Sequence, residues 1–176
     1  MKQELKSENQ MRRIKLEKVV LSCGAVGADL EKAQKLLEIL TGKKAQIIKA
    51  GPKRRIPDFG VKPGLALGTR VTLRKNEAKE ILKRLLGAIN NTLKKSQISE
   101  NTFSFGIHEY IEIPGIEYQR EIGIRGLNVT ATFSRLGARV KRKKLKYGKI
   151  PEKQNISPEE LINFMKENFN IGVSAR

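Results

Sequence analysis

The sequence is poor in the residue types that most enzymes and metal sites need. It contains one cysteine, Cys23, one histidine, His108, and no tryptophan, and only 5% of its residues are aromatic. A single cysteine cannot form an internal disulfide, and one cysteine with one histidine cannot supply the roughly four ligands of a structural zinc site. No recognisable motif of nucleophile, base and acid surrounds His108, so we expect no catalytic residue, no metal and no cofactor.

Long hydrophobic runs are also absent. The first ten residues contain no apolar segment of the kind found in signal peptides, and nowhere do about eighteen apolar residues follow one another as in a membrane-spanning helix. A length of 176 residues with 39% hydrophobic residues is nevertheless enough for one domain with a packed core. We therefore expect a soluble, cytoplasmic protein without a membrane partner, forming a single domain over residues 1–176 with a flexible N-terminus at 1–11.

Acidic residues are scarce, with 18 of them against 36 lysines and arginines, for a net charge of +18. Thirteen of these charges fall in two short stretches. Residues 43–62 hold seven basic residues and one acid, Asp58, and residues 139–149 hold seven basic residues and no acid. Such concentration predicts a polyanionic partner. A solvated surface, a nuclear-localisation signal or a membrane-surface patch are the alternatives, although Leu145 and Tyr147 are few apolar residues for lipid binding.

Apolar periodicity predicts alternating strands and helices. The predicted strands cover 13–21, 46–49, 67–74, 103–108 and 127–133; the predicted helices begin at the N-caps Asp29, Asn76 and Ser157 and reach Gly42, Leu93 and Phe169. Six glycines and prolines between residues 49 and 67 predict a projecting basic loop, and residues 139–155 form a second basic segment.

This order of elements predicts an α+β fold, with a mainly antiparallel sheet, helices on one face and the other face open for RNA. Strand alternation places small polar and cationic residues on the open face and no aromatic ring, which disfavours a reader of stacked single-stranded bases and favours folded RNA. The residues concerned are Arg70, Thr72, Arg74, Ser104, His108, Asn128, Thr130 and Thr132.

Several motifs, in order, resemble those of one family. They are RIKLEKVVL at 13–21, FGVKPG at 59–64 followed by GTRVTLR at 68–74, FSFGIHE at 103–109 and EIGIRGLNV at 121–129. Together they resemble the universal L-five family of large-subunit ribosomal proteins, in its archaeal and eukaryotic branch. The chain departs from the family pattern at Ser22 to Gly27 and at Arg135 to Ala138, so no contacts are carried over there.

The resemblance implies an rRNA-binding protein that is not an enzyme. It implies binding to 5S rRNA and to large-subunit rRNA in the central protuberance, contact of the basic loop with P-site tRNA, and contact with the small-subunit protein S-thirteen and with neighbouring 5S-binding ribosomal proteins. The 5S rRNA site is predicted at Arg12, Arg13, Lys15, Arg70, Thr72, Arg74, Asn128, Thr130 and Thr132. The tRNA loop is predicted at Lys53, Arg54, Arg55 and Lys62, and other rRNA contacts at Arg139, Lys141, Arg142, Lys143 and Lys144.

Two other classes of function remain open from the residues alone. A general nucleic-acid chaperone has the same basic composition, since the electrostatic part of RNA binding is independent of sequence. An enzyme acting on a phosphorylated substrate could use the turn at Gly24 to Gly27, although the chain lacks a complete dinucleotide or phosphate-binding loop motif.

Overall fold

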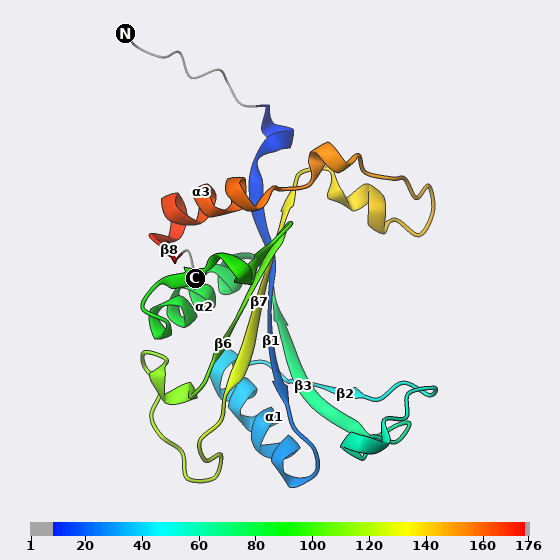
Figure 1. Cartoon of the computed structure of the whole chain (residues 1–176), viewed down its shortest axis with the longest axis vertical. Coiled ribbons are helices and arrows are strands. Elements are labelled where there is room, and N and C mark those ends of the chain that lie inside the picture. Colours follow the sequence, from blue (N-terminus) through cyan, green and yellow to red (C-terminus); the bar gives the residue numbers. More distant parts are fainter. Residues whose placement is uncertain (1–8, 175–176) are drawn as a thin grey trace.

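The computed structural model describes residues 9–174 (Figure 1). Its three α-helices are α1 (Ala28–Thr41), α2 (Lys75–Ala88) and α3 (Pro158–Phe169). The strands of this part of the chain are β1 (Ile14–Gly24), β2 (Gln46–Lys49), β3 (Ala66–Leu73), β4 (Thr92–Lys94), β5 (Ile98–Ser99), β6 (Thr102–Ile107), β7 (Leu127–Arg135) and β8 (Gly172–Ser174). Of the N-terminal segment 1–11 that the sequence predicts to be flexible, residues 1–8 lie outside the described part.

Six of the strands form one sheet in the order β2-β3-β1-β7-β6-β5, and every neighbouring pair is antiparallel. The two longest strands, β1 and β7, are neighbours at the centre of the sheet. A separate pair, β4 and β8, is parallel. The predicted α+β class with a mainly antiparallel sheet is therefore confirmed.

All three helices pack on the same face of the sheet. Inward residues of the strands, such as Val19, Leu73 and Phe133, form one core with buried residues of the helices, such as Leu37 and Leu82. Phe133 lies at the centre of an aromatic group, since its ring stacks on that of Phe103 at 5.7 Å and meets Phe164 edge to face at 5.8 Å. Within residues 9–174, no α-helix covers the opposite face, and the two basic segments project on that side (Figure 1).

β1 contains a bulge at Glu17. The register with β7 shifts between Leu16 and Lys18, so Glu17 has no partner across the strand pair. Both Leu16 and Val19 consequently face the core although they are three residues apart, and alternation resumes on either side. In the sequence, apolar residues therefore alternate at Ile14 and Leu16, skip one position at Glu17, and alternate again from Val19 to Leu21.

Helix ends agree with the sequence in part. Gly42 ends α1 in the left-handed conformation, and Ser157 begins α3 in a capping box with Glu160 and Pro158 at the first position, as predicted. The predicted N-caps Asp29 and Asn76 are wrong. Both lie inside the first turn, because α1 starts after Gly27 and α2 after Arg74, and neither helix start is capped by a side-chain hydrogen bond.

Two further assignments need correction. α2 ends at Ala88 rather than at Leu93, because Asn90 and Asn91 adopt positive φ and turn the chain into β4. Leu93 is buried as expected but reaches the core from a strand that pairs with β8. His108 is exposed and follows the end of β6, so it lies outside the sheet rather than on its open face.

Candidate nucleic-acid interface

The open face of the sheet presents short polar side chains in rows that cross several strands. Residues directly opposite one another in neighbouring strands share a face, so the register defines each row. The three rows are Arg70, Ser22 and Asn128; Thr72, Val20, Thr130 and Ser104; and Lys18, Thr132 and Thr102. With strands about 4.8 Å apart, a row from β3 to β6 is roughly 14 Å wide.

The exposed side chain of Asn128 lies close to the backbone of the neighbouring strand. Its partner on β6 is Gly106, where a Cβ atom would come 3.2 Å from the Asn128 Oδ1 atom. A larger residue at 106 would therefore displace the amide. Within the described strands β1, β3, β6 and β7, the rows contain no aromatic ring. Apart from Val20, their side chains are hydroxyl, amide and cationic groups, which suit a sugar-phosphate backbone.

Two cations of β1 belong to this face. Lys15 lies opposite Ser134 and Lys18 opposite Thr132 in the β1–β7 pair. From the sequence we predicted Lys15 but not Lys18, because the bulge at Glu17 shifts the alternation and so changes the face of the sheet on which Lys18 lies. Apolar residues three apart, Leu16 and Val19, between two alternating runs were the signal that could have revealed it.

Arg70 of β3 and Arg74, which follows the strand, differ in their surroundings. Arg70 is exposed, and its Nε donates to the Gln46 Oε1 atom at 3.1 Å, so a neutral partner holds the guanidinium and its charge stays available. Arg74, which the sequence predicts within the strand, lies one residue beyond β3 as the N-terminal cap residue of α2. It is exposed, with its Nη1 atom 4.0 Å from a carboxylate oxygen of Glu17. Of the two arginines, Arg70 is therefore the one whose charge is not shared with a carboxylate.

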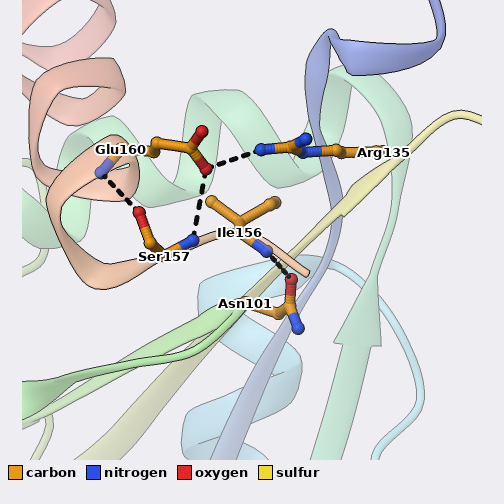
Figure 2. Close-up of polar contacts among 5 residues, drawn as sticks. All are labelled: Asn101, Arg135, Ile156, Ser157 and Glu160. Atoms are coloured by element: carbon orange, nitrogen blue, oxygen red, sulfur yellow. Dashed lines mark hydrogen bonds and ion pairs between the residues drawn. The ribbon is translucent and has the colours of Figure 1, made fainter. Parts of the chain in front are cut away.

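Arg12 and Arg13 do not lie with the other predicted contacts. They line a cavity of about 450 Å³ beside α3, together with Arg135 and Glu160. Figure 2 shows Arg135 extended toward α3, where its Nη2 donates to the Glu160 Oε2 atom at 2.5 Å. Burial alone would raise the pKa of Glu160, but the bonds from Arg135 and the Ser157 N–H, with the nearby positive charges, outweigh it and lower the pKa.

The same region anchors the segment that leads into α3. The Ile156 N–H donates to the Asn101 Oδ1 atom at 2.8 Å, and the Ser157 N–H donates to Glu160 Oε2 at 3.2 Å (Figure 2). Glu160 thus receives bonds from both the sheet and the helix cap. The predicted RNA contacts Arg12 and Arg13 consequently extend the surface around the end of the sheet rather than across its open face.

The basic loop, residues 50–65, is a hairpin-like projection from β2 and β3. Its tip is closed by two backbone bonds between Ile56 and Val61, at 3.1 and 3.0 Å, and Gly60 turns in the left-handed conformation. All four predicted cations of this loop are exposed, as is Phe59, whose side chain is 81% exposed at the tip. The loop therefore offers charge and one aromatic ring well away from the rows of the sheet.

The basic arm, residues 138–150, leaves the end of β7 on the same side as the basic loop (Figure 1). Its turn is closed by a bond from the Gly148 N–H to the Val140 carbonyl at 3.3 Å, and all five of its predicted contact residues are exposed. Arg142 also pairs with Glu17 of the bulge. The open face is thus bordered by one basic projection at each end.

Cys23 is a packed thiol. It is buried at the end of β1 and donates to the Gly126 carbonyl at 3.3 Å. Burial raises its pKa, so the nucleophilic thiolate is disfavoured. The adjacent turn leads into α1, whose first turn already contains Asp29 and Glu31, and these acids disfavour a phosphate at that helix end.

Residues 9–174 contain no cluster of three or more histidine, cysteine, aspartate or glutamate side chains arranged to hold a metal ion. In the same range, no helix has the length and apolar character needed to cross a membrane.

Comparison with known proteins gives a consistent match along the chain. The family model described as ribosomal protein L5 matches residues 9–62, and the one described as the ribosomal L5P family C-terminus matches residues 66–164. A large ribosomal subunit protein uL5 from Sulfolobus acidocaldarius is 43% identical over 174 residues, covering 97% of each chain. Proteins of the same description are 41% identical in Sulfurisphaera tokodaii, over 97% of each chain, and 39% identical in Nanoarchaeum equitans, over 94% of this chain and 99% of the relative.

Proposed function

The chain belongs to the ribosomal protein L5 family, and from this premise we propose that it binds 5S rRNA and attaches it to the large rRNA in the central protuberance. Family membership makes it a structural, non-enzymatic constituent of the large ribosomal subunit, associated with rRNA and acting in translation on the ribosome. In this proposal the protein is cytoplasmic and needs no cofactor.

The open face is the observation that supports 5S rRNA as the ligand. Its rows place Asn128, Thr130 and Thr132 beside the cations of β1 and β3. Hydroxyl and amide groups can bond to ribose 2′-hydroxyls, which distinguish RNA from DNA, while arginine and lysine neutralise phosphates. A surface roughly 14 Å wide without stacking rings suits a folded RNA helix more than an extended single strand.

We assign the two basic projections to different RNAs. The basic loop, with Lys53, Arg54, Arg55 and Lys62, contacts P-site tRNA, because its exposed tip stands apart from the rows of the sheet. The basic arm, with Arg139, Lys141, Arg142, Lys143 and Lys144, contacts rRNA. Contacts with the small-subunit protein S-thirteen and with other 5S-binding ribosomal proteins use further surfaces of the molecule.

A competition experiment tests the main proposal. Labelled 5S rRNA is bound at about physiological salt, where non-specific contacts are weak, and is then challenged with excess tRNA or with an RNA duplex of equal length. A preference for 5S rRNA of about a hundredfold or more is expected of specific recognition. Equal competition by all three RNAs would refute the proposal and favour a general nucleic-acid chaperone.

A further inference from the structure

Glu17 is an acid in the middle of a basic surface. The side chain is only 12% exposed, and both its cationic contacts come from elsewhere in the chain: Arg142 of the basic arm and Arg74 at the end of β3. Lys15 and Lys18 flank it on β1. A carboxylate so little exposed must be paired, and here the pairing joins two segments that are 68 residues apart in sequence.

The bulge accounts for the position of the carboxylate. Glu17 is the extra residue of β1, without a partner on β7, and a bulge of this kind re-aims one side chain while the flanking residues keep their faces. In a regular strand, residues three positions apart face opposite sides, so Leu16 and Val19 could not both be buried in the core. The irregularity therefore places an acceptor at the end of the open face, where the arm passes.

The arm has a further anchor at its base and leaves a gap above the sheet. The Gln154 Nε2 atom donates to the Leu136 carbonyl at 3.0 Å, which closes the base, whereas Arg142 lies farther along the arm. Between arm and sheet lies a cleft of about 440 Å³, lined by groups from both sides that include Glu17, Thr132, Arg142 and Tyr147. The Glu17–Arg142 pair thus joins the arm to β1 across this cleft.

We infer that Glu17 is a positioning residue for RNA binding, whose carboxylate holds the basic arm at the end of the open face so that Arg74 and Arg142 form one anion-binding surface with the sheet. This inference rests on the proposed function, in which that face binds RNA. It assigns a role in binding to an acid that itself repels RNA.

The sign of one substitution separates this role from simple electrostatics. Glu17→Gln removes a negative charge beside four cations, so charge alone predicts tighter RNA binding. If Glu17 positions the arm, the substitution weakens binding, and the slope of log K against log salt falls by about 0.7 to 0.9 because one phosphate contact is lost. Glu152→Gln, which makes the same charge change in an exposed residue just beyond the arm, is the control and does not weaken binding or lower the slope.

The position of the arm can be measured without RNA. The arm is rich in trypsin sites, so its cleavage rate reports how often it leaves the sheet. Glu17→Gln is expected to accelerate cleavage between residues 139 and 149. Arg142→Gln, which alters a half-exposed residue and leaves the other sites intact, is expected to do the same. The double variant should be cleaved little faster than either single one, since both remove the same contact.

The outcomes are distinct. Faster cleavage with weaker RNA binding supports the inference. Unchanged cleavage, additive effects in the double variant, or faster cleavage with tighter or equal RNA binding would each overturn it. If the unaltered protein shows no preference for 5S rRNA, the proposed function fails, whereas the cleavage experiment still decides whether Glu17 holds the arm.

Discussion

Removing Arg70 and Arg74 from the open face should change the salt dependence of 5S rRNA binding. Both arginines are exposed, Arg70 within β3 and Arg74 just beyond its end. Arg70 is held by the neutral Gln46 and keeps its full charge, whereas Arg74 shares Glu17 with Arg142. We therefore expect Arg70→Ala to have the larger effect of the two single substitutions.

The magnitude follows from counterion release. Each lost phosphate contact lowers the slope of log K against log salt by about 0.7 to 0.9, so the double substitution should flatten it by roughly one to two. Over a fourfold rise in salt, from about 50 to about 200 mM, one such contact corresponds to about a threefold change in affinity. Over this range of salt, the affinity of both proteins falls, but the factor by which the double variant weakens should be up to about nine times smaller than the factor for the unaltered protein.

Fluorescence titration of labelled 5S rRNA at several salt concentrations measures this slope. The matched control is Lys79→Ala with Lys83→Ala, which removes two exposed charges from α2, on the helix-covered side. An unchanged slope in the double arginine variant, or an equal change in the lysine control, would refute the assignment of RNA to the open face.

Three other predictions concern separate parts of the molecule. Alanine at Lys53, Arg54 and Arg55 should leave 5S rRNA binding intact and weaken binding of tRNA to assembled ribosomes; equal loss of 5S rRNA binding would contradict the division between loop and sheet. Phe133→Ala, which empties the centre of the aromatic group, should lower the free energy of unfolding by about 3 to 5 kcal/mol in denaturant titrations, and a loss below about 1 kcal/mol would show that the ring is not packed as described. Because the pKa of Glu160 is lowered in the folded state, its contribution to stability is full above the ordinary value of about 4.3 and disappears as the pH falls through the lower folded value. The difference in melting temperature between the protein and its Glu160→Gln variant should therefore shrink between neutral pH and about pH 3, and a difference independent of pH would argue against an ionised partner for Arg135.

The sequence predicted those parts of the fold in which local pattern and tertiary packing agree. Alternation in β6 and β7 placed the buried residues correctly, in β3 it did so from Thr69 to Leu73, and the capping box at Ser157 marked the start of α3. These signals depend on neighbours within a few positions, so they can be recognised without knowledge of the rest of the chain.

Features that depend on distant partners could not be predicted in this way. The bulge at Glu17 is defined by its register with β7, more than one hundred residues away. Leu93 looked like the end of a helical stripe because nothing nearby indicates that β8 will pair with its segment. Asp29 and Asn76 are good capping residues by type, but φ at Gly27 and the end of β3 determine where the helices begin.

The candidate site shows the same limit. The cations and hydroxyls of β3 and β7 were predicted individually, whereas their rows with Lys18 and Ser22 require the strand order β3-β1-β7. Arg12 and Arg13 were predicted as RNA contacts at the start of the N-terminal strand. Their position against α3 depends on a helix from the other end of the chain.

The central place of β1 has a consequence for how the protein is made. During synthesis, β1 is completed before its partner β7, which begins at Leu127, roughly 100 residues after the end of β1. At a synthesis rate of about 5 to 20 residues per second, the edge of β1 that pairs with β7 remains without its hydrogen-bonding partner for roughly 5 to 20 s. During this time its unpaired backbone groups and its apolar residues Val19 and Leu21 can pair with another chain. A nascent chain of this protein therefore has its greatest need of chaperone protection before residue 135 has been synthesised.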